Sequence, residues 1–145
     1  MPPRGLRTVP AAVHSRRLPR YRPDPRYGSR AHHDDDRAVA RVASGSIVGT
    51  IAGHPRATEG HLRGMAVLPE CHGKGVSPRL LDAIERELAD LGCTDVTLDT
   101  TAPLRRAVVF YTRNGYVATG TASDFFGMPI FEYRKRIAGE VASLT

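Results

Sequence analysis

The sequence predicts a single α/β (α+β) domain built on a mixed sheet, and two observations lead to that fold class. From about residue 38 onward the apolar pattern becomes regular and follows the order β-β-β-α-β-α-β-β. The length of 145 residues and a composition that is 41% hydrophobic and 25% charged suit one globular domain with one core. These values exclude a disordered, fibrous or membrane-spanning chain.

The first three strands are expected at the start of the regular region. Ala38–Ala43 and Ile47–Ala52 flank a Ser-Gly-Ser turn sequence, which predicts a hairpin. We expect the run Gly53-His54-Pro55 to end the second strand. The third strand is predicted at His61–Leu68, which is closed by a proline.

An amphipathic helix is predicted after a glycine-containing loop. Apolar residues fall on one face at helical spacing, namely Leu80, Leu81, Ile84, Leu88 and Leu91. Ser77 is the expected N-cap, and Pro78 fits the first helical position, where its missing N–H group is harmless. Gly92 is the expected end of the helix.

The C-terminal elements complete the pattern. They are a strand at Asp95–Asp99, a helix that carries Leu104, Ala107, Val108 and Tyr111 and ends at Gly115, and strands at Tyr116–Gly120 and Ile130–Arg136. Between the last two strands lies the apolar run Asp124–Pro129, which either forms a wall of a binding pocket or caps the core.

Charge and proline content separate the first 37 residues from the rest. Residues 1–33 contain eight arginines and one acidic residue, whereas residues 34–145 contain 13 basic and 14 acidic residues. Six of the 11 prolines lie in residues 1–25, a density that breaks helices and strands. We therefore expect a disordered or atypical Arg/Pro-rich segment at 1–37, a folded domain at 38–137 and a short tail at 138–145.

Other interpretations of the N-terminal segment stay open. An Arg-rich stretch also fits a mitochondrial-type targeting peptide, although it has few hydroxyl residues and no amphipathic repeat. Its arginines also fit binding to a phosphate backbone. The ratio of 19 arginines to two lysines fits a GC-rich genome. In that interpretation, part of residues 1–35 results from a start codon assigned too early. The lack of an apolar stretch excludes a secretory signal peptide.

Metal and disulfide chemistry are not expected. The two cysteines, Cys71 and Cys93, form neither a four-sulfur zinc site nor a disulfide-dense scaffold. A thiol nucleophile at Cys71 is not expected either, because no partnered triad is recognisable. The cluster of His32 and His33 with the aspartates at 34–36 is interpreted as solvated charge rather than as metal ligands.

The loop before the amphipathic helix carries the clearest chemistry. Gly73-Lys74-Gly75 joins a strand to that helix, and glycine lets the backbone approach a ligand closely. The helix points its free N–H groups and its positive dipole end at the loop, an arrangement that suits a phosphate or pyrophosphate. The spacing does not match a P-loop, and Pro78 does not match the dinucleotide fingerprint.

Two motifs resemble the GNAT superfamily of acetyl-CoA-dependent N-acetyltransferases. The first is the loop Val67-x-Pro69-Glu70-x-His72-Gly73-Lys74-Gly75-Val76 before the amphipathic helix, and the second is Ala107-x-x-x-Tyr111 followed by Gly115-Tyr116. The resemblance covers about residues 38–137. It implies a GNAT-like, mostly antiparallel mixed sheet flanked by helices, with atypical or missing N-terminal elements, and it implies acetyl-CoA as co-substrate.

The resemblance also implies roles for single residues. Backbone groups of residues 65–67 would pair with the pantetheine arm, and the glycine loop would hold the pyrophosphate. Tyr111 would lie near the CoA sulfur and protonate the departing thiolate; without the resemblance, an aromatic residue on this apolar helix face is interpreted as a core residue. The implied cofactor-binding residues are Met65, Ala66, Val67, His72, Gly73, Lys74, Gly75, Val76 and Ser77.

Three positions depart from the family pattern. His72 stands where glutamine or arginine is usual, and Ser77 stands where glycine or alanine is usual. Leu104 takes the place of a common asparagine, so the contact of that asparagine with CoA is not expected.

Attack by an amine requires a group that takes up a proton. Some relatives carry a glutamate on the strand before the glycine loop, and the matching position here is His61. Strict alternation predicts that His61, Arg63, Met65 and Val67 share one face of the strand, and histidine exchanges protons near neutral pH. A histidine at a solvent-exposed edge is the alternative interpretation. Other candidate bases are Glu59, Glu70 and Asp99; Asp99 and Thr100 end the strand that is expected to splay away and line the cleft.

These observations favour transfer of an acetyl group from acetyl-CoA to a primary amine by direct attack in a ternary complex. The alternatives are a non-catalytic or degenerate acyl-CoA-binding domain and a nucleic-acid-binding module that uses the basic tail. The acceptor stays open between a small molecule, an antibiotic, a peptide N-terminus and a protein lysine. We expect no specific nucleic acid, no membrane partner and a cytoplasmic location, and the resemblance allows a homodimer.

Overall fold

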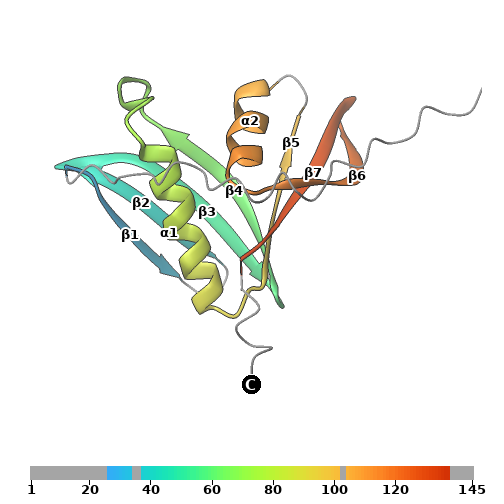
Figure 1. Cartoon of the computed structure of the whole chain (residues 1–145), viewed down its shortest axis with the longest axis horizontal. Helices are drawn as coiled ribbons and strands as arrows, with labels where there is room; N and C mark the ends of the chain where they lie inside the picture. The colour runs from blue at the N-terminus through green and yellow to red at the C-terminus, as the bar shows by residue number, and fades with distance from the viewer. Residues whose placement is uncertain (1–25, 34–36, 102–103, 138–145) are drawn as a thin grey trace, which may run out of the picture.

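The computed structural model describes residues 26–33, 37–101 and 104–137. Seven strands in these ranges form one sheet in the order β1-β2-β3-β4-β5-β7-β6 (Figure 1). The strands are β1 (Gly28–His33), β2 (Ala38–Ser44), β3 (Ser46–Arg56), β4 (Glu59–Val67), β5 (Asp95–Thr100), β6 (Val117–Phe125) and β7 (Met128–Arg136). The helices are α1 (Val76–Asp90), α2 (Arg105–Arg113) and the short 3-10 helix η2 (Pro69–Cys71).

The predicted fold class is confirmed. Neighbouring strands are antiparallel except for β4 and β5, which run parallel because α1 carries the chain across between them. The result is a mixed, mostly antiparallel sheet with helices packed on it.

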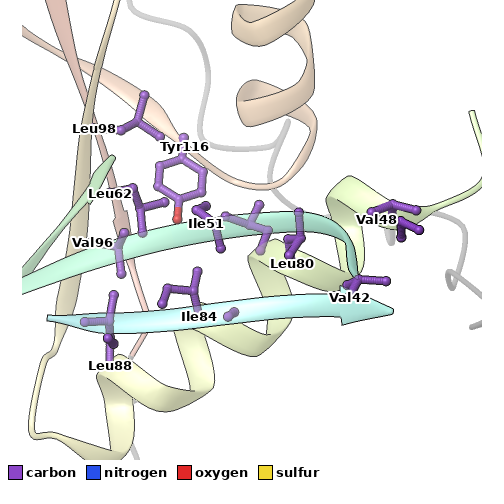
Figure 2. Close-up of a cluster of buried hydrophobic side chains, with 14 of the residues drawn as sticks. Val42, Val48, Ile51, Leu62, Leu80, Ile84, Leu88, Val96, Leu98 and Tyr116 are labelled. Atoms are coloured by element: carbon purple, nitrogen blue, oxygen red, sulfur yellow. The ribbon is translucent and has the colours of Figure 1, made fainter. Parts of the chain in front are cut away.

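The core lies between α1 and the first strands of the sheet. The apolar face of α1 that the spacing predicted is buried, with Leu80, Leu81, Ile84 and Leu88 at most 2% exposed. Figure 2 shows Leu80, Ile84 and Leu88 with side chains of β2, β3 and β5 and with Tyr116, which joins the same cluster. Burial of this face holds α1 in place and fixes where the loop before it can lie.

Strand β1 corrects the expectation for the N-terminal segment. It pairs antiparallel with β2 along its whole length, and Tyr27 just before it belongs to the core. The sequence reasoning failed here because most β1 side chains are exposed, which leaves no alternation to detect. The expected boundary at residue 37 therefore runs between two paired strands. Residues 1–25, 34–36 and 138–145, and the interpretations that rest on them, lie outside the described residues.

Strand β3 is longer than predicted, because Gly53 does not end it. A Cβ atom at Gly53 would meet Leu88 Cδ1 at 3.0 Å, so the glycine permits close packing of α1. Gly49 and Gly60 serve the same purpose. Pro55 follows the last pair with β2, where β3 has a partner only on the β4 side and a missing donor is tolerated.

The start of α1 also differs from the prediction. Gly75, not Ser77, is the N-cap, and it has a left-handed backbone with φ of 78°. Ser77 makes no capping hydrogen bond and occupies the second helical position. Pro78 is third, still within the first turn, whose N–H groups have no partner inside the helix.

The C-terminal hairpin contradicts one of the two interpretations of residues 124–129. Strands β6 and β7 run to a tight turn at Phe126-Gly127, where Asp124 Oδ2 accepts a hydrogen bond from the Gly127 N–H group. Phe126 is 93% exposed, and Phe125 and Met128 are also exposed. This run is therefore the solvent-facing tip of a hairpin and does not cap the core.

Two findings concern absence within the described part of the chain. None of its helices is both long and apolar enough to span a membrane. Nor do its His, Cys, Asp and Glu side chains gather in a group of three that suits a metal ion.

Candidate active site

The sheet opens between β4 and β5. The two strands pair only over Glu59–His61 and Asp95–Thr97, and then they diverge (Figure 1), with α2 in the opening. From Leu62 to Val67, no described strand pairs with the β5-facing edge of β4. The splay expected from the sequence is present, and it leaves a row of backbone groups available to a ligand.

A bulge in β4 divides the strand into two parts. In the pairing with β3, Arg63 lies opposite Ala52 and Ala66 lies opposite Thr50, so β4 has one extra residue at Gly64, whose φ is +63°. Paired residues share a face. Leu62 and Val67 thus lie on the side of their partners Gly53 and Gly49, which is the α1 side.

The bulge overturns the expectation that four alternating residues of β4 share one face. His61 and Arg63 alternate with Leu62 and face away from α1, whereas Val67 faces α1. The physical reason is that one inserted residue reverses the alternation beyond it.

Two chambers meet at this opening. The first, which we call the loop chamber, has a volume of about 510 Å³ and is lined by Met65, Cys71, His72, Gly73, Gly75, Val76, Ser77, Pro78, Arg106, Ala107, Phe110 and Tyr111. The second, the splay chamber, has a volume of about 400 Å³ and is lined by Ile51, His61, Leu62, Arg63, Gly64, Met65, Leu98, Asp99, Thr100, Leu104, Ala107 and Tyr111. Three residues line both: Met65, Ala107 and Tyr111.

The loop chamber suits an anion. Gly73 and Gly75 both have positive φ values, of 75° and 78°, so the loop turns directly into the first turn of α1. A Cβ atom at Gly73 would meet nothing within 4 Å, so glycine is required there by the backbone conformation rather than by space. Val76 and Ser77, in the first turn of α1, line this wall, and the positive end of the helix dipole lies there too.

Six of the nine predicted cofactor-binding residues line the loop chamber, namely Met65, His72, Gly73, Gly75, Val76 and Ser77. Ala66, Val67 and Lys74 do not. The His72 ring donates from Nε2 to the Val67 carbonyl at 3.2 Å, which fastens the loop to the end of β4. Cys71 is buried in this wall.

Arg106 is a wall residue that sequence reasoning missed. It lies in the first turn of α2 and lines the same chamber as the glycine loop. The sequence gives only a weak signal that Arg106 lines the chamber, namely its position five residues before Tyr111. The signal is weak because α2 comes to lie beside the loop only in the folded chain.

Tyr111 stands at the junction of the two chambers. Its ring packs edge-on against Phe110 at 5.2 Å and Tyr116 at 5.5 Å between centroids. Burial raises the pKa of Tyr111 above its usual value of 10.0, so the phenol keeps its proton at neutral pH.

Behind Tyr111 lies a hydrogen-bonded cluster formed by Glu85, Tyr116 and Lys135. The Tyr116 hydroxyl donates to Glu85 Oε1 at 2.9 Å, and Lys135 Nζ donates to both oxygens of Glu85 at 3.0 and 2.9 Å. Burial, followed by the charge and hydrogen bond of Glu85, raises the pKa of Tyr116 far above its usual range. The cluster joins α1 and β7 to the residue that backs Tyr111.

His61 lies in the wall of the splay chamber beside an acid. Its Nδ1 atom is 2.8 Å from Thr97 Oγ1, and its Nε2 atom is 3.3 Å from Asp99 Oδ2. The other two candidate bases lie elsewhere: Glu59 forms an ion pair with Arg134, and Glu70 lines neither chamber. The structure thus gathers His61, Asp99 and Tyr111 around one space.

Comparisons with known proteins agree with the fold. The crystal structure of ribosomal-protein-S18-alanine N-acetyltransferase from Escherichia coli matches with a TM-score of 0.65 at 19% identity, over 75% of this chain and 76% of that chain. A GNAT family acetyltransferase from Elizabethkingia anophelis with acetyl-CoA bound matches with a TM-score of 0.66 at 9% identity, over 78% and 99%. The PaiA N-acetyltransferase from Thermoplasma acidophilum in complex with coenzyme A matches with a TM-score of 0.60 at 22% identity, over 70% and 61%.

These three matches establish the fold. The family assignment comes from the sequence, because the model of the acetyltransferase (GNAT) family matches residues 8–116. That range includes β1, the glycine loop, α1 and α2. It exceeds half of the chain, and the chain therefore belongs to the GNAT acetyltransferase family.

Proposed function

We propose that this protein transfers an acetyl group from acetyl-CoA to a primary amine by direct attack while both substrates are bound. The observation that carries the proposal is the position of Tyr111, which lines both chambers where they meet. One chamber is suited to a phosphate-bearing ligand, and the other holds a histidine–aspartate pair. A group at their junction is placed to act on both substrates.

The residues of the loop chamber fit acetyl-CoA. N–H groups of the loop and the first turn of α1, from Gly73 to Ser77, would hold the pyrophosphate, and Arg106 would add positive charge. The free edge of β4, at Met65–Val67, would pair with the amide groups of the pantetheine arm. Acetyl-CoA supplies an acetyl group activated as a thioester.

His61 is proposed as the base. With its proton on Nδ1, the ring donates to Thr97 Oγ1 and leaves the Nε2 lone pair to take a proton from the amine. The Asp99 carboxylate at 3.3 Å stabilises the positive charge that the ring then carries. His61 thus makes the amine nucleophilic as its nitrogen forms the new C–N bond.

Tyr111 is proposed as the acid. Its hydroxyl makes no hydrogen bond to the described residues, and burial keeps it protonated. Tyr111 Oη donates its proton to the sulfur as the C–S bond breaks, and solvent restores it afterwards. This role requires only that Tyr111 lies at the junction of the two chambers. The second sequence motif is the reason why Tyr111 was a candidate for it.

The decisive experiment combines binding and turnover in one set of variants. We expect acetyl-CoA, but not adenosine, to raise the melting temperature. We also expect Tyr111→Phe to keep that shift while the rate of CoA release with a panel of amines falls about 100-fold or more. Tyr133→Phe is the matched control, because Tyr133 lines neither chamber.

Two outcomes would contradict the proposal. Equal rates in wild type and Tyr111→Phe would remove Tyr111 from the reaction. A melting shift without turnover of any amine would favour the alternative, a non-catalytic acyl-CoA-binding domain.

A further inference from the structure

Two polar residues of the splay chamber have no part in the reaction proposed above. They are Arg63 on β4 and Thr100 at the end of β5. Each lacks a polar partner within the described residues, and both line the space into which an acceptor amine would enter. A chamber with two unsatisfied polar side chains can bind a ligand that supplies their partners.

Arg63 is a free cation at the mouth of the chamber. It lies two residues after His61 on the face of β4 turned away from α1, which places the two residues roughly 7 Å apart along the strand. Two other surface arginines form ion pairs, Arg134 with Glu59 and Arg86 with Asp82. Arg63 makes no ion pair or hydrogen bond among the described residues, so its guanidinium can bind an external anion.

Thr100 presents a buried hydroxyl. The residue is 7% exposed, and its Oγ1 atom has no hydrogen-bond partner in the part of the chain that the structure describes. An unsatisfied buried hydroxyl lowers stability. The unsatisfied hydroxyl is explained if a bound acceptor donates a hydrogen bond to Thr100 Oγ1.

The charges of the chamber distinguish between kinds of acceptor. Its lining contains one cation, Arg63, and one anion, Asp99, with His61 beside the anion. A polyamine or another polycation would meet repulsion from Arg63. A molecule with one amine and one carboxylate would place the amine beside His61 and Asp99 and the carboxylate on Arg63.

We propose that the acceptor is of the amino-acid type: a small primary amine that carries a carboxylate, which Arg63 binds at the mouth of the splay chamber while Thr100 Oγ1 accepts a hydrogen bond from the amine. This inference rests on the proposed function. It adds a class of acceptor and two residues that select it.

The test uses matched sets of acceptors with the full chain. One set is phenylalanine, phenylalaninamide and phenethylamine, and the second is alanine, alaninamide and ethylamine. The amide form also stands for a peptide N-terminus. Because the three amines of a set differ in basicity, each acceptor is compared between variants rather than with the other acceptors.

We expect Arg63→Ala to lower kcat/KM for the amino acids roughly ten- to a hundredfold, mainly through KM, as for the loss of one charge-assisted hydrogen bond. The amides and simple amines should change less than about threefold. Arg63→Lys should retain part of the effect, and Arg63→Glu should favour the simple amines. Arg41→Ala is the control, because Arg41 is an exposed strand arginine outside both chambers.

Thr100→Val supplies an independent readout. It removes the hydroxyl at nearly constant volume, so we expect the melting temperature to stay constant or rise while KM for the acceptor increases. A merely structural threonine would instead lower stability and leave KM unchanged, which would remove Thr100 from the site.

A binding measurement separates this inference from the proposed function. Calorimetric titration of phenylalanine into the CoA-saturated protein should detect binding that Arg63→Ala abolishes. Binding of this kind without turnover of any acceptor would support the subsite and reject the proposed reaction. Turnover of amines with no difference between wild type and Arg63→Ala, or no Arg63-dependent binding, would overturn the inference.

Discussion

The two sides of the splay differ sharply in how they are packed. On one side, α1 lies on β1, β2 and β3 and buries Val76, Leu80, Leu81, Ile84 and Leu88. On the other side, α2 has no fully buried residue, and every residue of β6 is exposed. The first side supplies the backbone of the loop chamber, whereas the second supplies Tyr111. The proposed catalytic side chain, Tyr111, therefore lies on the less tightly packed half and depends on contacts that reach across to the other half.

The largest effect should come from removing core volume on the α1 side. Val42 on β2 is fully buried, so Val42→Ala should lower the free energy of unfolding by about 2–3 kcal/mol. The same change at Val117 on β6, which is half exposed, should cost less than about 0.5 kcal/mol. Urea unfolding of both variants measures the contrast. Equal losses would mean that the β6 side is packed as tightly as the α1 side.

A smaller effect should follow when the link between the halves is weakened. Glu85→Gln removes the charge that pairs with Lys135, so we expect a loss of about 1–2 kcal/mol and a kcat reduced several-fold because Tyr111 loses its support. Asp82→Asn on the same helix is the control, since its pair with Arg86 is exposed. An unchanged kcat in Glu85→Gln would show that the cluster stabilises the fold without positioning Tyr111.

High pH should weaken the same link. The pKa values of Tyr111 and Tyr116 are raised in the folded protein, mainly by burial, so above about pH 10 the unfolded chain loses these protons first. Stability is therefore full below pH 10 and falls above it, by about 1.4 kcal/mol per pH unit for each such tyrosine. Melting curves of wild type and Tyr116→Phe between pH 8 and 11 measure this, and the variant should show the shallower fall. A fall of equal steepness would remove Tyr116 from the alkaline transition.

The smallest effect is expected at the hairpin tip. Phe126→Ser should change the free energy of unfolding by less than about 0.5 kcal/mol, since the ring is almost fully exposed. Urea unfolding and the rate with acetyl-CoA and an amine are the measurements. A loss above 1 kcal/mol would mean that the tip is covered in solution.

The elements with strong local signals could be predicted from the sequence. The apolar spacing of α1, the turn at 44–46 and the glycine after α2 predicted these features near their observed positions. The glycine loop and Tyr111 belong to the two motifs that predicted the family, and the family model matches a range that contains both. Asp99, the acidic partner of His61, was predicted only as one of several candidate bases.

The sequence-based predictions were wrong or incomplete where the role of a residue depends on contacts that form only in the folded chain. Gly53 has the sequence signature of a strand end, but it makes room for Leu88. Strand β1 lies at the edge of the sheet and shows no alternation. Arg63, Thr100 and Arg106 became candidates only when the fold placed them around a common space.

The bulge at Gly64 has a consequence for how this strand can change during evolution or engineering. Deleting one residue at the bulge would restore strict alternation and turn everything beyond it to the opposite face. Conversely, substitutions before the bulge, at positions such as Arg63, leave the orientation of the segment beside the glycine loop untouched. The extra residue thus separates the segment proposed to bind the acceptor from the segment proposed to bind acetyl-CoA, so that a substitution in the first segment leaves the side chains of the second on their present face.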